Sequence, residues 1–116
     1  MNNDSISVKI RDDITLIINP GDRLDNSNAN DMVKIICQAQ SDGYKYIMLD
    51  FAGLEFISSS GVGSILGTIE TSRNQGGDII IYCASPKIMR VFEALDLSEY
   101  LTFCETEEKA LKIEGN

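Results

Sequence analysis

The segment LDFAGLEFISSSGVGSILG, residues 49–67, joins the end of an apolar run to the start of a helical pattern. The run YIMLDF at 46–51 is typical of a central strand that is covered on both faces. Beyond the serines, apolar residues recur at helical spacing, namely Val62, Ile65, Leu66 and Ile69. This stripe predicts a helix that buries it. The segment therefore predicts a strand, a loop and a helix, with Asp50 ending the strand and three serines beside the helix start.

Two strands and a helix are predicted on the amino-terminal side of this unit. Residues 5–10 and 14–19 predict an antiparallel hairpin, because a short polar turn joins them. A helix follows, with Ser27 or Asn28 placed to accept its first amide hydrogens and Gly43 after its last turn. Its apolar stripe consists of Ala29, Met32, Val33, Ile36 and Cys37.

On the carboxyl-terminal side, strands and helices continue to alternate. The run IIIYCA at 79–84 predicts a second buried strand, and Ser85 with Pro86 supplies an N-cap and a preformed first helical residue. The inner face of that helix is predicted to hold Val91, Phe92 and Leu95. A short strand at 101–104 and a helix opened by Thr106 complete the pattern.

Strands that alternate with helices over short connections predict an α/β fold. We expect one domain over residues 1–116, with a mixed, mostly parallel sheet of about four to five strands and about four helices. In such sheets, functional sites gather where strand carboxyl ends meet helix amino ends. The serine triplet lies at such a junction and is therefore the first candidate for a site.

The acidic composition argues against two classes of partner. The chain has 18 acidic and 10 basic residues and a formal charge of −8, so it repels phosphate backbones and anionic lipid heads. We expect no nucleic-acid and no membrane partner. With neither a signal-peptide pattern nor an apolar run of the roughly 18 residues that a spanning helix needs, a cytoplasmic location is expected. The excess acid is explained either by solubility or by steering towards a basic partner.

Histidine and cysteine usage bounds the chemistry. The chain has no histidine, which removes the usual general base, the usual metal ligand and the middle member of a Ser-His-Asp triad. Cys37, Cys83 and Cys104 lie far apart in apolar stretches, so we expect core thiols rather than a disulfide framework or a metal cluster. Most hydrolase mechanisms are therefore excluded, and we expect no metal site and no cofactor.

Three interpretations of the SSSGVG motif at 58–63 compete. In the first, the serines cap the helix and the glycines permit a sharp turn and close packing. In the second, amides near Gly61 and Gly63 hold a nucleotide phosphate, although the dinucleotide spacing and the P-loop ending are both missing. In the third, a serine accepts a phosphoryl group. A nucleophile elbow is excluded, because its G-x-S-x-G spacing and its histidine partner are absent.

The segment 49–67 resembles the signature of STAS domains, specifically the bacterial anti-sigma factor antagonists. In that pattern an apolar strand, an aspartate and a short loop precede Asp-Ser-Ser-Gly-x-Gly. The loop GDRLDNSNA at 21–29 is similar to the family's G-x-L-D-x-x-x-A, and the order of strands and helices extends the resemblance over nearly the whole chain. One position departs from the pattern, because Ser58 stands where the motif has its aspartate and can replace only a capping role.

The resemblance implies a switch protein rather than an enzyme. Antagonists of this family bind an anti-sigma factor that is also a serine kinase, and so free the sigma factor for transcription. That kinase phosphorylates the second serine of the motif, a serine phosphatase reverses the reaction, and only the unphosphorylated antagonist binds well. The resemblance implies phosphorylation of Ser60, with Ser59 as the second choice and Ser58 as the third. It places the partner-binding loop at Asp25, Ser58, Ser59, Gly61, Val62, Gly63 and Ser64.

Two other classes of function remain open. A STAS domain can be a scaffold or interaction module of a larger signalling complex without a working phosphoswitch, and a small-ligand-binding domain is the third class. We expect the free protein to be a monomer. We also expect an exposed face of the helix after Ser60, with Ser64, Thr68 and Thr71, to add contacts with the partner.

Overall fold

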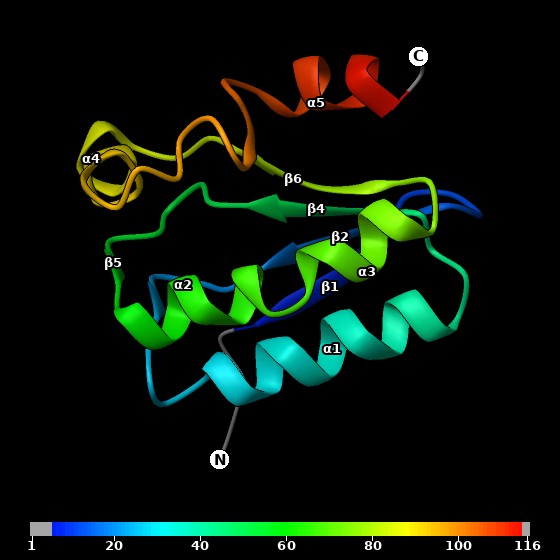
Figure 1. Ribbon diagram of the computed structural model, residues 1–116, viewed down its shortest axis with the longest axis horizontal. Coiled ribbons are helices and arrows are strands. Elements are labelled where there is room, and N and C mark those ends of the chain that lie inside the picture. Colours follow the sequence, from blue (N-terminus) through cyan, green and yellow to red (C-terminus); the bar gives the residue numbers. More distant parts are fainter. Residues whose placement is uncertain (1–5, 115–116) are drawn as a thin grey trace.

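The computed structural model of the protein describes residues 6–114. Figure 1 shows a central sheet with helices on both sides of it. The strands of this region are β1 (Ser7–Ile10), β2 (Thr15–Asn19), β3 (Arg23–Leu24), β4 (Tyr46–Asp50), β5 (Phe56–Ile57), β6 (Asp78–Tyr82) and β7 (Thr102–Cys104). The helices are α1 (Ala29–Ser41), α2 (Ser59–Leu66), α3 (Ile69–Asn74), α4 (Pro86–Ala94) and α5 (Glu107–Glu114).

Five strands form the main sheet in the order β1-β2-β4-β6-β7. β1 runs antiparallel to β2, whereas β2, β4, β6 and β7 run parallel to one another. The predicted mixed, mostly parallel sheet with an antiparallel edge hairpin is therefore confirmed. Ser5, the predicted start of the first strand, lies outside the described residues. The helix predicted after the serines is divided into α2 and α3 around Gly67 and Thr68, which gives the described region one helix more than expected.

Alternate residues of β4 and β6 serve two separate cores. Leu49 and Ile81 belong to the larger core beneath α1, α2 and α3, whereas Met48 and Ile80 pack with Ala110 of α5. All four strand side chains have no exposed surface. The unbroken apolar runs are thus central strands covered on both faces, as the sequence predicts.

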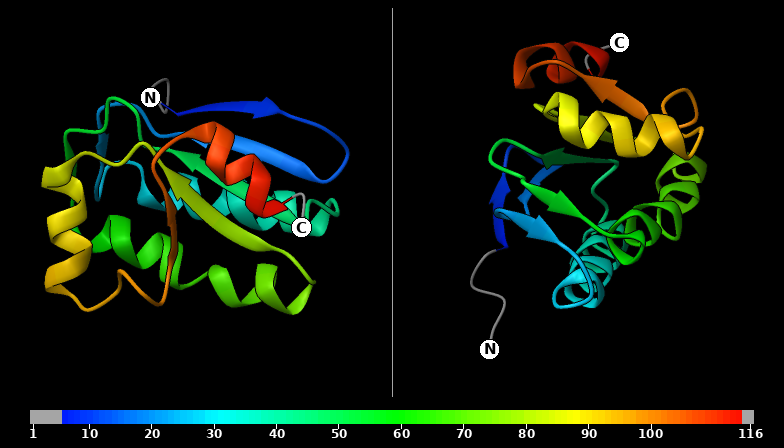
Figure 2. Two further views of the ribbon diagram at one scale, coloured as in Figure 1. Left: turned by 90° about the horizontal axis from the view of Figure 1, so that it is seen from above. Right: turned by 90° about the vertical axis from the view of Figure 1, so that its left-hand side faces the viewer.

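The carboxyl ends of the parallel strands share one end of the molecule with three other elements. Figures 1 and 2 both place β5, the start of α2 and helix α4 at this end. Asp50 is the last residue of β4, as predicted. The fold therefore presents the serine segment at the edge where α/β sheets usually hold their sites.

The prediction that Leu66 and Leu95 lie on buried inner faces of their helices is wrong, because each residue lies at a helix end. Leu66 is the last residue of α2, where the helical path is interrupted, and 38% of it is exposed. Leu95 is the C-cap of α4 and is 51% exposed. Ile88, in the first turn of α4, is buried with Phe92 instead.

The cysteines are less buried than predicted. Cys37 is exposed on α1, because the buried face of that helix is centred on Met32 and Ile36 and the next residue is turned by 100° away from it. Cys83 and Cys104 are half-buried beside the smaller core. Burial raises the pKa of both of these thiols, which favours their unreactive protonated form.

Within the described residues, no helix combines the length and the apolar character needed to cross a membrane.

Candidate functional site

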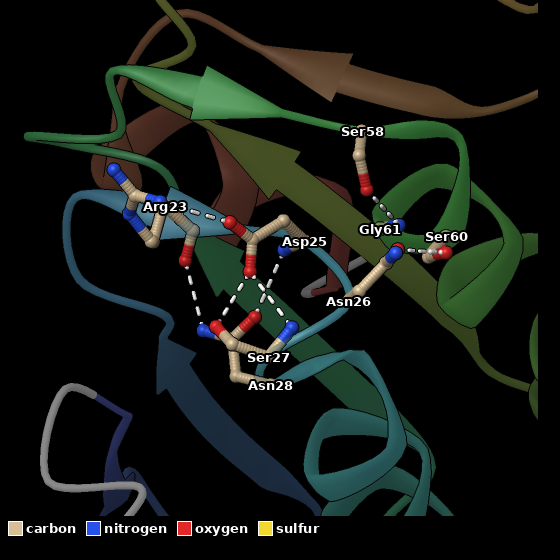
Figure 3. A network of polar contacts seen from close by, with 8 residues as sticks. All are labelled: Arg23, Asp25, Asn26, Ser27, Asn28, Ser58, Ser60 and Gly61. Atoms are coloured by element: carbon tan, nitrogen blue, oxygen red, sulfur yellow. Dashed lines mark hydrogen bonds and ion pairs between the residues drawn. The ribbon is translucent and has the colours of Figure 1, made fainter.

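Two very short strands bring together loops that are distant in the sequence. β3 and β5 pair in parallel with Leu24 opposite Ile57. Just beyond this pair, the Ser58 amide donates to the Leu24 carbonyl oxygen at 3.0 Å. The pairing sets the loop at 25–28 beside the first turn of α2 (Figure 3). The candidate site therefore consists of this 25–28 loop and residues 58–61.

The first turn of α2 is capped and closely packed. Ser58 is the N-cap, and its Oγ accepts the Gly61 amide at 3.3 Å, so serine performs the capping role that the sequence assigns to it. A Cβ on Gly61 would lie 2.4 Å from the Leu24 carbonyl oxygen and 2.8 Å from Cγ1 of Ile57. Only glycine allows the helix to approach β3 and β5 this closely.

The three serines occupy three different environments. Ser58 is half-buried and its oxygen serves the cap, whereas Ser59 is exposed at the first helical position. Ser60 is also exposed, and its hydroxyl donates to Oδ1 of Asn26 at 2.5 Å, across 34 residues of sequence (Figure 3). Ser60 is thus both accessible and oriented by a second segment of the chain.

Asp25 organises the 25–28 loop from within. Its Oδ1 accepts the Ser27 amide at 2.9 Å and the Ser27 hydroxyl at 2.6 Å, and its Oδ2 accepts Nη1 of Arg23 at 3.1 Å. The hydrogen bonds from Ser27, with the Arg23 guanidinium as a lesser cause, hold the pKa of Asp25 below its ordinary value. The carboxylate is therefore ionised at neutral pH, and in this arrangement it fixes the loop without contacting Ser60.

The side chain of Asn28 stabilises the loop and makes no capping hydrogen bond to α1. Its Oδ1 accepts the Asp25 amide at 2.9 Å, and its Nδ2 donates to the Arg23 carbonyl oxygen at 2.9 Å. No side-chain hydrogen bond caps the first turn of α1 from this residue. Asn28 is the N-cap residue by position, but the prediction that Ser27 or Asn28 accepts the first amide hydrogens of α1 is wrong, because both polar side chains turn back into the loop.

The contact face predicted on the helix after Ser60, which the structure divides into α2 and α3, is largely buried. The Ser64 hydroxyl donates to the Gly61 carbonyl oxygen at 2.6 Å, and the Thr68 hydroxyl donates to the Ser64 carbonyl oxygen at 2.8 Å. Ser64 and Thr68 are each 3% exposed, so the prediction of an exposed face through them is wrong, whereas Thr71 is exposed. Among the residues of the predicted binding loop, Val62 is buried as well.

The surface beside Ser60 contains a shallow depression and a large apolar side chain. The depression has a volume of about 410 Å³ and is lined by Arg23, Asp25, Asn26, Ser27, Phe56 and Ser58. Phe56 is 49% exposed. Gly63 is exposed one turn after Ser60, and a Cβ added there would have no neighbour within 4 Å. The sequence analysis missed Asn26 and Phe56, because no motif or periodic spacing marks either residue.

A model of the STAS domain family matches residues 5–110. The match covers most of the chain, and the fold and the serine motif agree with it, so the protein belongs to the STAS domain family.

Within that family the chain resembles anti-sigma factor antagonists. An anti-sigma F factor antagonist from Paenibacillus polymyxa is 28% identical over 98 residues, which cover 83% of each protein. The structure of the anti-sigma factor antagonist SpoIIAA in its unphosphorylated form superposes with a TM-score of 0.83 at 26% identity, covering 96% of this chain and 97% of that one. The Bacillus cell fate determinant SpoIIAA in the phosphorylated form gives a TM-score of 0.73 at 27% identity, covering 92% and 96%.

Proposed function

We propose that this protein is an anti-sigma factor antagonist that is switched off by phosphorylation of Ser60. The observation that carries the proposal is the accessible Ser60 hydroxyl in the first turn of α2, oriented by the separate 25–28 loop. The relatives named above are anti-sigma factor antagonists, and one of them has been observed in a phosphorylated form. In its unphosphorylated state, the protein binds an anti-sigma factor and releases the sigma factor, and it works in the cytoplasm as a monomer when free.

The phosphoryl transfer uses ATP bound to the partner, which is also a serine kinase. Oγ of Ser60 forms a bond to the γ-phosphorus while the bond from that phosphorus to the β,γ-bridging oxygen breaks, so ADP leaves. The hydroxyl proton passes to a base on the kinase, because the described part of this chain places no carboxylate in hydrogen-bond contact with Ser60. A serine phosphatase later hydrolyses the phosphoserine.

The phosphate changes binding rather than folding. It adds nearly two negative charges at the amino end of α2, where the helix dipole and the free first-turn amides favour an anion. A partner that docks over Ser60 must then desolvate this charge. A loss of about 3–4 kcal/mol weakens binding by several hundredfold.

The predicted binding loop divides into contact residues and supporting residues. Ser59 and Gly63 lie at the surface and are proposed to meet the partner, together with half-buried Asp25 and Ser58. The buried members Gly61, Val62 and Ser64 hold the turn in place from below.

Mass spectrometry after incubation with ATP and each serine-kinase anti-sigma factor of the same cell tests this function. We expect one phosphate, mapped to Ser60 rather than to Ser58 or Ser59, and no phosphate on a Ser60→Ala variant. A folded protein that receives no phosphate from any candidate contradicts the switch. That outcome favours the scaffold function, with Ser58 in place of the family's aspartate as the reason.

A further inference from the structure

A hydrogen bond between the side chains of Asn26 and Ser60 joins the 25–28 loop to the start of α2. Oδ1 of Asn26 accepts the Ser60 hydroxyl, although both residues are exposed and lie on different segments (Figure 3). Asn26 is flanked by the hydrogen bonds that Asp25 and Asn28 make with each other, with Ser27 and with the Arg23 carbonyl oxygen. The loop therefore presents the Asn26 amide from a fixed position.

An amide side chain can serve both states of a serine. A carboxamide carries an acceptor oxygen and a donor NH₂ group on the same carbon, and a half-turn about its terminal bond exchanges them. A serine hydroxyl can donate to the oxygen, as Ser60 does here. A doubly ionised phosphate has no proton to donate and accepts hydrogen bonds only. Its favourable partner is therefore the NH₂ group.

We propose that Asn26 is a positioning residue matched to both states of Ser60, accepting a hydrogen bond from the hydroxyl and donating one to the phosphate. The exchange needs only a rotation of the Asn26 amide, so the backbone of the 25–28 loop stays in place. Asp25 cannot perform this task, because an ionised carboxylate only accepts hydrogen bonds and repels a phosphate. The inference rests on the proposed function to the extent that Ser60 carries the phosphate.

Asn26→Asp is the informative variant, because it keeps the shape of the side chain and removes its donor. The carboxylate still accepts the Ser60 hydroxyl but faces the phosphate with a like charge. Asn26→Ala removes both abilities without adding a charge. Asn74→Asp, at the exposed far end of α3, is the matched control for the added charge (Figure 1).

The test uses full-length protein with phosphoserine inserted at position 60 during translation, so it needs neither a kinase nor a partner. The second ionisation of that phosphate is followed by phosphorus NMR during a pH titration. We expect its pKa to be lowest in the native sequence and in Asn74→Asp, higher in Asn26→Ala, and highest in Asn26→Asp. Identical titrations in all four proteins would overturn the proposal.

A second measurement needs no variant that could fail to fold. In nitrogen-15 spectra of the native chain, the side-chain NH₂ signals of Asn26 should move on phosphorylation and again as the phosphate is protonated. Signals that stay in place would contradict the amide rotation. Failure of both tests leaves the switch at Ser60 intact, whereas failure of every kinase to modify Ser60 leaves these two readouts unaffected, so the two failures are distinguishable.

Discussion

The starts of α2 and α4 are alike in their local chemistry and differ in their surroundings. Each is preceded by a serine N-cap with extended backbone, and the cap oxygens accept the Gly61 amide at 3.3 Å and the Ile88 amide at 3.2 Å. In α4 the third helical residue is the buried Ile88, whereas in α2 it is Gly61, pressed against the β3 backbone. Of these two helix starts in the described region, only that of α2 makes a side-chain hydrogen bond with a distant loop, between Ser60 and Asn26. A capping serine therefore accounts for the start of either helix. The contact with the 25–28 loop is what distinguishes the candidate site at the start of α2.

A negative charge at the second helical residue should separate the two helix starts most strongly. Ser60→Asp is expected to weaken binding to the anti-sigma factor by several hundredfold, about 3–4 kcal/mol, while the thermal unfolding midpoint stays near that of the native protein. Lys87→Glu, at the equivalent exposed position of α4, should leave binding unchanged. Titration calorimetry and thermal melting measure both properties. A Ser60→Asp protein that melts far below the native one would sink this account, and Ser60→Ala should keep both fold and binding.

The two glycines of the α2 start should respond oppositely to an added methyl group. Gly61→Ala forces a Cβ against the Leu24 carbonyl oxygen and is expected to reduce the free energy of unfolding by roughly 1–3 kcal/mol. Gly63→Ala meets open space on an exposed helical turn and should be neutral or stabilising by up to about 1 kcal/mol. Urea unfolding provides the comparison. Equal losses in the two variants would show that close packing on β3 is not the reason for Gly61.

The caps themselves should be nearly equivalent. Ser58→Ala and Ser85→Ala each remove one side-chain acceptor and should each lower the free energy of unfolding by about 1 kcal/mol. Ser58→Asp restores the residue type of the family pattern and should retain full stability, because aspartate caps as well as serine. A loss much larger at Ser58 than at Ser85 would show that the first cap does more than satisfy one amide.

The smallest expected effect is a pH dependence of the free energy of unfolding that arises from Asp25 in the 25–28 loop. The pKa of Asp25 is lower in the folded state than its ordinary value of 3.8, chiefly through hydrogen bonds from Ser27. Ionised Asp25 therefore contributes its full stabilisation above pH 3.8, and this contribution is lost as the pH falls through the lowered pKa. Asp25→Asn should slightly reduce the free energy of unfolding near neutral pH. It should also make that free energy less dependent on pH in the acidic range. Chemical denaturation at several pH values measures this, and parallel curves for the two proteins would argue against it.

Features with a local cause could be predicted from the sequence. The apolar runs gave β4 and β6, Ser85 with Pro86 marked the start of α4, and Thr106 accepts the Lys109 amide at 3.2 Å before α5 as its position suggests. In contrast, β3 and β5 contain two residues each and leave no periodic signal.

The candidate site was predictable in part for the same reason. The cap at Ser58 follows from local chemistry, whereas the contact from Asn26 depends on the pairing of β3 with β5. Periodicity marked the helix after the serines and the buried stripe of Val62, Ile65 and Ile69, but not that burial extends to the polar Ser64, so Ser64 was placed on an exposed face. Long-range packing, rather than residue type, decides both of these features.

The environments of Ser58, Ser59 and Ser60 differ only in the folded protein, after Leu24 has paired with Ile57. During synthesis, or in a locally opened chain, three adjacent hydroxyls stand on one flexible peptide and nothing sets Ser60 apart from its neighbours. Once the two short strands meet, one hydroxyl serves as a cap and another is held by Asn26. On the proposed function, a kinase that recognises Ser60 by its contact with Asn26 requires the pairing of β3 with β5, and would therefore act on the folded protein rather than on the unfolded chain.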